Sequence, residues 1–325
     1  MKIAIVGAGM CGLSAARALQ GHEITLFEKN KRVGGRVSTF TQDGFIWDTG
    51  ATSIAPRGKA LEQVMLHEID TTDLVKVEKP IYTHQALRVI PGDPRRQHER
   101  YTYRKGIATL PRLLAVGLDI RLDTQVESLE EQGGTYSLTT SSGVEGGFDY
   151  VILTPPIPRT SILLWSLGES RAIASVFYRA CINVALGYDQ PLPPTAYHAL
   201  LDPDQRHPLT WVSLESVKSP GRAPEGGAAI CVQLSPTFSL DHYAKDDKYL
   251  IDTTLFFVAK LYGEGFLKPL SSTVKRWKYS QPESTVSIED ANPPGAKVLI
   301  ASDALLGGHT EDAYEVGQRV AQLIH

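Results

Sequence analysis

The sequence predicts an α/β protein in which a discontinuous Rossmann-type domain is joined to a mixed α+β domain built on an antiparallel sheet. Three observations favour this fold class. The chain opens with a short apolar strand, a glycine-rich turn and a helical segment, and a second strand then ends at an acidic residue. Motifs that belong with this opening return in separated stretches, the last of them near the C-terminal end. Short alternating or apolar segments lie between them, as expected for sheet strands.

The first strand is "KIAIV" at residues 2–6, whose β-branched residues suit burial on both faces of a parallel sheet. A glycine pattern, G-x-G-x-x-G, follows at once at residues 7–12, and within it Gly7, Gly9, Met10, Cys11 and Gly12 are the candidate ligand-binding residues. In this pattern the first glycine permits a tight turn, the second lets backbone approach a diphosphate, and the third lets helix and strand touch. The N-terminus of the following helix presents free N–H groups to the phosphates.

The second strand, "EITLFEK", ends at Glu28, and Lys29 follows it. A carboxylate at this position accepts hydrogen bonds from the hydroxyls of an adenosine ribose and repels a 2′-phosphate. The strand, turn, helix, strand and terminal acid together predict a dinucleotide site.

The next motif bears on which dinucleotide is bound. Val33, Gly34, Gly35 and Arg36 form a V-G-G-R run where a nicotinamide dehydrogenase usually continues into another helix and strand. Two flexible backbone positions and a guanidinium suit a second contact with the diphosphate, because an arginine neutralises its charge.

These motifs resemble the flavin-containing amine oxidase superfamily, in which the Rossmann fingerprint followed by G-G-R is characteristic of FAD. "WDTGATSI" is similar to the D-x-G-A segment beneath the flavin, and the resemblance implies that Gly50, Ala51 and Thr52 bind the cofactor. "YRKGIATLPRLLA" at residues 103–115 is similar to another family segment, with Ile107 where methionine is common. "LDTQVESLE" resembles the strand whose backbone at Val126 meets the adenine, and "FDYVILTPPIP", with Thr154, resembles the strand that leaves the FAD domain.

The C-terminal residues 297–324 resemble the closing flavin segment of that superfamily. The resemblance implies a strand that ends in Asp303, whose carboxylate binds the ribityl chain, although Ala-Ser-Asp stands where Gly-Asp is commoner. It also implies a helix whose N-terminus, with Asp312 and Ala313, faces the flavin ring. This segment contains no cysteine, so we expect noncovalent FAD.

Within the superfamily the chain is most similar to renalase and its bacterial relatives, on its short length, small middle segment and "KRWKYSQPE" at residues 275–283. The resemblance implies hydride transfer from a reduced nicotinamide nucleotide, NAD(P)H or an isomer, to flavin N5, with O2 as the acceptor and hydrogen peroxide as product. The residues predicted to meet substrate or flavin are Trp277, Tyr279 and His309. Plain core packing is the alternative for Trp277 and Tyr279. Arg57 and Arg104 are candidates for binding a substrate phosphate.

Two other kinds of function stay open from the sequence. One is an amine oxidase or desaturase of the same superfamily. The other is a flavin-binding redox sensor without turnover.

Composition excludes some partners. The formal net charge is -3, which gives no case for nucleic acid or an anionic membrane as a partner.

The three cysteines are scattered (Cys11, Cys181 and Cys231), as expected for reduced thiols in a cytoplasmic protein without a metal site. No apolar run is long enough to span a membrane. The oligomeric state is left open.

The FAD motifs place the predicted FAD-binding domain at residues 1–75, 102–158 and 288–325, and the substrate domain at 76–101 and 159–287. Within the substrate domain, a helical pattern begins at a predicted N-cap, Ser239.

Overall fold

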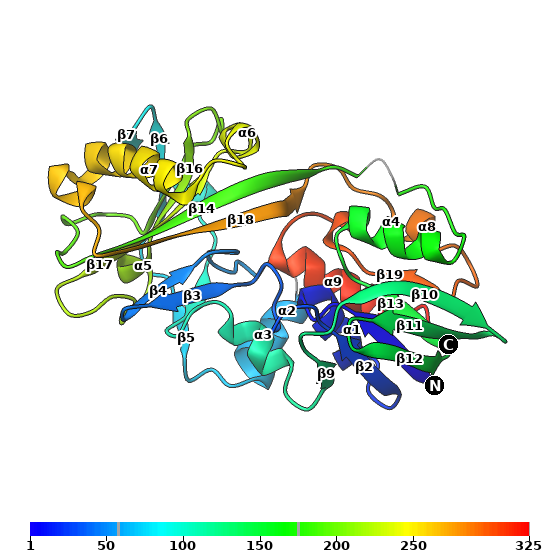
Figure 1. The fold of residues 1–325 in the computed structure, drawn as a ribbon. Coiled ribbons are helices and arrows are strands. Elements are labelled where there is room, and N and C mark those ends of the chain that lie inside the picture. Colours follow the sequence, from blue (N-terminus) through cyan, green and yellow to red (C-terminus); the bar gives the residue numbers. More distant parts are fainter. Residues whose placement is uncertain (57–58, 174–175, 325) are drawn as a thin grey trace.

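The protein contains a five-stranded parallel sheet and a seven-stranded mixed sheet (Figure 1). The computed structural model describes residues 1–56, 59–173 and 176–324. The order of the parallel sheet is β19-β13-β1-β2-β9, and its strands are Val298–Ile300, Tyr150–Leu153, Lys2–Val6, Glu23–Phe27 and Asp119–Arg121. The predicted α/β class, with a Rossmann-type sheet assembled from separated stretches of the chain, is confirmed.

Four of the parallel strands end level with one another. Val6 pairs with Phe27 on one side and with Leu153 on the other, and Leu153 pairs with Ile300. The residues that leave the sheet at this edge are Gly7, Glu28, Thr154 and Ala301. In open α/β sheets, ligands bind at the edge formed by the carboxyl ends of the strands.

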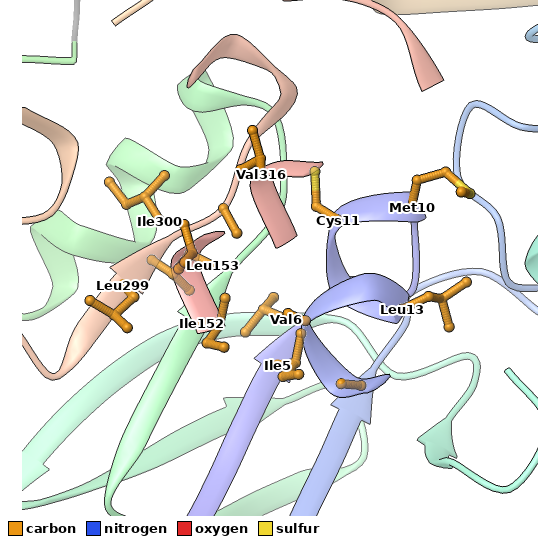
Figure 2. Packing of buried hydrophobic residues seen from close by; sticks show 14 of the residues in the cluster. Ile5, Val6, Met10, Cys11, Leu13, Ile152, Leu153, Leu299, Ile300 and Val316 are labelled. Carbon is orange, nitrogen blue, oxygen red and sulfur yellow. The ribbon is translucent and has the colours of Figure 1, made fainter. Parts of the chain in front are cut away.

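The core of this part lies between the parallel strands and two helices, α1 (Met10–Ala18) and α9 (Thr310–Ala321). Figure 2 shows Cys11 of α1 and Val316 of α9 in one buried cluster with residues of three strands, namely Ile5, Val6, Ile152, Leu153, Leu299 and Ile300. The two helices approach closely because Gly317 has no side chain, and a Cβ there would overlap the backbone oxygen of Cys11. The last helix is thereby fixed against the first.

Smaller elements surround the parallel sheet. A three-stranded antiparallel sheet contacts β1 and β13, and its strands are β10 (Val126–Gln132), β11 (Thr135–Thr140) and β12 (Gly143–Phe148). The remaining helices of this region are α2 (Lys59–Gln63) with a π-helical continuation (Val64–Glu68), α3 (Thr109–Leu114), α4 (Ile157–Ser166) and α8 (Ile288–Ala291). Two antiparallel strand pairs are β3 (Thr39–Gln42) with β4 (Phe45–Asp48), and β5 (Leu74–Lys76) with β8 (Tyr101–Tyr103).

The seven-stranded sheet has the order β18-β14-β17-β16-β15-β6-β7, and only the β15–β6 pair is parallel. Its strands in that order are Ser271–Pro282, Tyr178–Tyr188, Ala228–Leu234, Leu209–Leu214, Ala199–Leu201, Ile81–Gln85 and Arg88–Ile90. Figure 1 shows β14 and β18 as long strands that reach from this sheet toward α4, α8 and α9. These two strands therefore connect the two halves of the molecule.

The two faces of this sheet differ because side chains alternate along each strand. Ile182 and Val184 of β14 are fully buried in an apolar cluster that includes Leu250 and Val258 of α7 (Asp247–Tyr262). The opposite face carries Ala185, which packs with Phe45 and Trp47 of β4. That second face also carries polar side chains, and it meets the segments that follow β4.

The helical pattern that we assigned to one helix with Ser239 as its N-cap forms two helices, so that prediction is wrong. α6 covers Pro236–Asp241 and is capped by Ser235, while Asp246 caps α7. Proline is pre-organised for the first helical position, which explains why α6 begins directly after Ser235. Ser239 lies buried inside α6, and α5 (Glu215–Lys218) precedes both helices.

Strands from both stretches of the predicted substrate domain join one sheet, since β6 pairs with β15, which follows residue 159, and β7 pairs with β6. The domain boundaries themselves stay a prediction. Within the described ranges, no helix combines the length and apolar character that crossing a bilayer requires.

Candidate functional site

The glycine turn lies at the carboxyl edge of the parallel sheet and is shaped by close contacts. A Cβ on Gly12 would overlap the backbone oxygen of Gly7, and one on Gly7 would overlap Oγ1 of Thr154. Gly9 differs, because a Cβ built there meets no atom within 4 Å. Gly9 caps α1 without a side-chain hydrogen bond. The turn is therefore closed toward the sheet and open on the side of Gly9, where a diphosphate could approach the helix N-terminus.

Glu28 follows β2 at the same edge and is only 5% exposed. Its carboxylate accepts a 3.0 Å hydrogen bond from Ala8 N and a 2.9 Å hydrogen bond from Asn30 N, as well as one from the Asn30 side chain. These contacts fix the carboxylate beside the glycine turn. A surface hollow of about 430 Å³ lies nearby, lined by Lys29, Asp123, Gln125, Glu127, Ser141 and Ser142. The hollow thus touches both sequence neighbours of Val126, at the position where the adenosine is expected.

The G-G-R run packs directly on the glycine turn. Gly34 N donates a 2.8 Å hydrogen bond to Ala8 O, and a Cβ on Gly35 would lie 3.6 Å from Gly9 Cα. The segment after β4 then packs on the G-G-R run: Ala51 N donates to Arg36 O at 2.9 Å. The structure thus brings three predicted FAD motifs into contact through their backbones: the glycine turn, the G-G-R run and the segment after β4.

Arg36 reaches the C-terminal segment. Its Nη1 donates a 2.7 Å hydrogen bond to Asp303 and a 3.1 Å hydrogen bond to Ser280 O. Burial and the charge of Asp303 raise the pKa of the Cys11 thiol, while Arg36 lowers it. Because Gly35 packs on Gly9 and the adjacent Arg36 binds Asp303, Asp303 is close to the glycine turn.

Asp303 itself lies just beyond the last strand. We expected the strand to end in Asp303, but β19 ends at Ile300 and Asp303 begins a 3-10 turn, so this detail is wrong. Tyr178 donates a 3.2 Å hydrogen bond to its carboxylate, and Ser302 donates another. The turn begins after Ser302 because that hydroxyl caps it. Asp303 is buried, and the side chains of Arg36, Tyr178 and Ser302 orient its carboxylate.

The N-terminus of α9 contains three more predicted residues. The His309 side chain is 61% exposed, and its Nδ1 donates a 2.9 Å hydrogen bond to Asp312. The same carboxylate accepts from the backbone N–H of His309, which forms a capping box, and Ala313 N donates to His309 O. His309 and Asp312 thus stabilise the helix start, while their contact with flavin or substrate stays a prediction.

Trp277 and Tyr279 lie on β18 but have different partners. Trp277 Nε1 donates a 2.6 Å hydrogen bond to Thr49 O. The ring of Tyr279 packs edge-to-face with Tyr178 at 5.8 Å between centroids. Trp277 is therefore joined to the segment predicted to pass beneath the flavin, whereas Tyr279 is joined to the tyrosine that binds Asp303. Both are partly buried, and their contact with substrate stays a prediction.

Two amide side chains that we had not singled out hold the same segment. Asn183 of β14 donates to Thr49 O, and Gln233 of β17 donates to Gly50 O at 3.1 Å. The two residues are directly opposite each other in the sheet, so their side chains share one face. Polar residues that interrupt apolar strands in "RACINVAL" and "AAICVQL" were the available signal.

The two arginines proposed for a substrate phosphate cannot both be placed. Arg104 is exposed, and its backbone N–H bonds to Asp73 O. Arg57 lies outside the described residues.

Comparison with known proteins places the motifs in one family. The sequence matches the flavin containing amine oxidoreductase family over residues 10–100 and 83–325, which together cover most of the chain. The chain belongs to this family. Its cofactor is therefore FAD, and the family that it belongs to is one of flavin-dependent oxidoreductases. The resemblance to renalase is a finer assignment that family membership leaves open.

Sequence relatives within the family include 4,4'-diapophytoene desaturases from Staphylococcus haemolyticus and Staphylococcus aureus. Each is 55% identical over 56 residues, which is 17% of this chain. The matched stretch spans only 11% of the length of those desaturases. Their activity is thus a property of proteins that share a short segment with this one.

Solved structures support the fold over the whole chain. A protein from Exiguobacterium sp. 255-15, provisionally named a protoporphyrinogen oxidase, superimposes with a TM-score of 0.81 at 18% identity, and 99% of this chain and 98% of that one are covered. Reduced UDP-galactopyranose mutase superimposes with a TM-score of 0.79 at 16% identity, and 99% of this chain and 94% of that one are covered. Wild-type putrescine oxidase bound to putrescine superimposes with a TM-score of 0.75 at 13% identity, and 99% of this chain and 98% of that one are covered. At these identities the similarity concerns the fold alone.

The site of this flavoprotein fits FAD on its own geometry. Gly9 leaves an open approach beside uncapped helical N–H groups, Glu28 is buried at the ribose end, and Arg36 and Asp303 stand together beyond the diphosphate position. We expect the N–H groups of the turn to bind the phosphates and Glu28 to bind the ribose. Asp303 would orient the ribityl chain.

A buried cluster of four charged residues was missed by the sequence analysis. The side chains of Asp48, Glu215, Lys218 and Arg222 are all fully buried. Lys218 Nζ lies 2.9 Å from Asp48 and 2.8 Å from Glu215, and Arg222 lies 2.9 Å and 3.0 Å from the same two acids. The two positive and two negative charges balance, which is the condition for burying them.

This cluster fixes the segment next to the flavin site. Lys218 also donates a 2.8 Å hydrogen bond to Thr52 O, and Asp48 accepts one from Ile107 N at 2.8 Å. Burial alone would raise the pKa of Asp48, but Lys218 and Arg222 outweigh that effect, and the pKa lies below its usual range. Arg222 lies in the proline-rich segment "SPGRAPEGG", which has the composition of a loop, so no periodicity signalled its burial.

Proposed function

We propose that the protein is an FAD-dependent oxidase of renalase type. Its substrate would be a reduced nicotinamide nucleotide, NAD(P)H or an isomer of it, and O2 would take the electrons and leave as hydrogen peroxide. When bound, FAD supplies a hydride acceptor at N5 and returns the two electrons to oxygen. A cytoplasmic location and noncovalent FAD belong to the same proposal.

The observation that carries this proposal is the chemistry of one face of the seven-stranded sheet. Asn183, Gln233 and Lys275 stand on it in one cross-strand row, and Trp277 is on the same face two residues from Lys275. Lys275 Nζ lies 4.8 Å from the Trp277 ring centroid. The amide groups of Asn183 and Gln233 donate to Thr49 O and Gly50 O, so the aromatic ring of Trp277 and the cation of Lys275 are the groups that suit a planar ring with a negatively charged substituent.

The composition of the same face also bears on the alternative substrates, amines and long hydrocarbons. A cation on the wall repels a protonated amine, and amide side chains are poor partners for a long hydrocarbon. Among the described residues of this row, no carboxylate stands ready to receive an ammonium group. The face therefore favours an anionic, polar substrate.

The residues of the chain would act mainly by positioning. Trp277 and Asn183 hold Thr49 O, and Gln233 holds Gly50 O, so three donors from the sheet fix the segment predicted to underlie the flavin. A dihydronicotinamide gives up hydride without losing a proton in the same step. No general base is therefore required, and positioning together with exclusion of water supplies the protein's part.

Anaerobic mixing of the purified holoprotein with candidate reductants tests the proposal. We expect NADH or one of its isomers to bleach the flavin absorbance, and admission of air to restore it with one hydrogen peroxide per flavin. Putrescine and benzylamine are the comparison substrates. Bleaching by an amine but by no dihydronicotinamide would overturn the proposal.

An amine oxidase or desaturase is the second candidate, and specific similarities favour it. The desaturases share a 56-residue stretch at 55% identity, and putrescine oxidase shares the fold. A desaturase would accept electrons from an apolar polyene, so reduction by a carotenoid precursor in detergent is its test. A redox sensor would show a flavin that cycles with dithionite and oxygen but with none of these substrates.

A further inference from the structure

Arg179, at the start of β14, is a cation without an acidic partner among the described residues. Its Nη1 donates a 3.0 Å hydrogen bond to Gln205, and its Nη2 donates to Gln281. Both acceptors are neutral amide oxygens, so neither compensates the positive charge. A guanidinium has five N–H donors, and these two bonds leave three of them available to a further acceptor.

The position of Arg179 is fixed by the strand opposite it. Arg179 is paired with Gln281 of β18, next to Ser280. Ser280 O accepts a 3.1 Å hydrogen bond from Arg36, and Gln281 packs so closely on Gly308 that a Cβ there would overlap its side chain. This end of β18 is therefore held between the diphosphate turn and the loop before α9.

The wall of side chains proposed to bind substrate (Asn183, Gln233, Lys275 and Trp277) lies further along β14, β17 and β18, beyond a shift in the pairing register between Arg179 and Cys181. Cys181 is two residues further along β14 and lies directly opposite Trp277. Burial raises the pKa of the Cys181 thiol to about 12, although Ser280 and the nearby charge of Arg179 each lower it. Arg179 is thus within electrostatic reach of the strand position that faces Trp277.

The loop that contains Gln205, one of the two hydrogen-bond partners of Arg179, has a strained backbone. Gln205 has a φ of +53°, in the left-handed region that a residue other than glycine seldom adopts. The loop is held in this form by Asp202, whose carboxylate accepts hydrogen bonds from Asp204 N at 3.2 Å and His207 N at 2.7 Å. Strain of this kind persists where surrounding structure fixes it, and it is common at binding sites.

We propose that Arg179 is a substrate-binding residue that pairs with a phosphate of the reduced nicotinamide nucleotide, a role that rests on the proposed function. Two amides hold the guanidinium plane while its charge stays available, and a planar fork of donors matches the oxygens of a phosphate. Lys275, on β18, adds positive potential on the approach. The ring would then lie toward Trp277 and the phosphate toward Arg179.

Paired reductants test this assignment on the holoenzyme. Reduced nicotinamide mononucleotide and NADH carry phosphate, whereas 1-benzyl-1,4-dihydronicotinamide carries the same ring without a charge. In Arg179→Gln we expect the second-order rate of flavin bleaching to fall at least about tenfold for the phosphate-bearing reductants, because a charge-assisted hydrogen bond is lost. The rate with the benzyl compound should stay within about twofold of the wild type.

Two variants and one binding measurement complete the design. Arg179→Lys keeps the charge but loses the fork, so we expect an intermediate rate. Arg88→Gln removes the same charge from β7, at the opposite edge of the sheet, and should leave all rates unchanged. Calorimetric titration of the oxidised holoenzyme with NAD+ should give a dissociation constant that Arg179→Gln raises about tenfold, with a weaker salt dependence.

The outcomes distinguish a failure of the role assigned to Arg179 from a failure of the proposed function. If the wild type reacts with NADH but Arg179→Gln keeps the NAD+ dissociation constant, or slows charged and uncharged reductants alike, the role of Arg179 is overturned and the proposed function stands. If no dihydronicotinamide bleaches the wild-type flavin, the proposed function itself fails, and the role of Arg179 fails with it.

Discussion

The guanidinium of Arg36 donates a 2.7 Å hydrogen bond to the carboxylate of Asp303, across 267 positions of the sequence. Asp303 is buried, while Arg36 is 31% exposed. The contact joins the turn after the second parallel strand to the turn after the last one. It therefore couples the two ends of the chain at the place where the diphosphate and ribityl parts of FAD are expected.

Replacement of Arg36 by glutamine should weaken FAD binding. The variant loses a charge-assisted donor toward the diphosphate and leaves buried Asp303 with hydrogen bonds only from Tyr178 and Ser302. We expect the dissociation constant of FAD to rise by about 10- to 100-fold. Titration of the apoprotein, followed by flavin fluorescence, measures it.

Arg121→Gln is the matched control for Arg36→Gln, because Arg121 is 57% exposed and pairs with Asp119 at 3.5 Å on the surface. Its FAD affinity should equal that of the wild type. Equal affinities for all three proteins would exclude a role of Arg36 in holding the cofactor.

Alanine at two glycines of the first turn should have opposite effects. A Cβ at Gly12 overlaps Gly7 O, so Gly12→Ala should lower the thermal midpoint of the apoprotein. A Cβ at Gly9 meets nothing within 4 Å, and the backbone there has φ of -81°, which any residue adopts. Gly9→Ala should therefore fold normally yet bind FAD weakly, because the methyl group fills the approach to the helix N-terminus.

Differential scanning fluorimetry of the two apoproteins, with and without FAD, distinguishes these cases. The expected pattern is a stable Gly9→Ala protein whose midpoint does not rise with FAD. A Gly9→Ala protein that FAD stabilises as strongly as the wild type would contradict the assigned position of the diphosphate.

The parts of the fold that the sequence predicted are those dictated by local pattern. "KIAIV", the glycine turn and Glu28 specify a strand, a close helix approach and a ribose-binding acid within about 30 residues, so they required no knowledge of distant contacts. The G-G-R run was predicted from its glycines and its guanidinium, whereas Asp303 was assigned by resemblance. The structure brings Arg36 and Asp303 together at 2.7 Å.

The parts that were missed depend on contacts between distant segments. Lys218 and Arg222 are hydrophilic residues in a short helix and a proline-rich loop, yet both are fully buried because Asp48 and Glu215 balance them. Hydrophobic periodicity cannot reveal such a cluster. The Ser239 error has a local origin, since Ser-Pro and Asp capping signals at Ser235 and Asp246 were stronger than the one chosen.

The buried charge cluster predicts a large loss of stability when one partner is removed. Lys218→Met leaves Asp48 and Glu215 with Arg222 as their one remaining cation, and Thr52 O without its donor. We expect the free energy of unfolding to fall by about 3–5 kcal/mol. Urea denaturation of the holoprotein, followed by circular dichroism, measures this change.

Lys248→Met is the control for Lys218→Met. Lys248 pairs with Asp252 on the surface, where Lys248 is 83% exposed, so removal of that ion pair should leave the urea midpoint unchanged. Similar losses in both variants would mean that the cluster contributes no more than a surface pair.

Acid should destabilise the protein between pH 6.5 and about 4 through His198. Burial lowers the pKa of His198 from 6.5 to about 4, despite its hydrogen bond to Lys79 O. In this window the unfolded chain binds a proton at His198 and the folded protein does not. The contribution of His198 is therefore fully present above pH 6.5 and is lost as the pH falls toward 4, by about 3 kcal/mol in total.

His198→Asn tests this linkage because the asparagine amide can still donate to Lys79 O but does not titrate. Urea unfolding at several pH values should show a shallower decline for the variant than for the wild type between pH 6.5 and 4. His98→Asn, at an exposed position, should retain the wild-type slope. His84 and His207, whose pKa values burial also lowers, would account for the decline that remains. If His198→Asn keeps the full wild-type slope, the acid sensitivity arises elsewhere and His198 carries a proton in the folded protein.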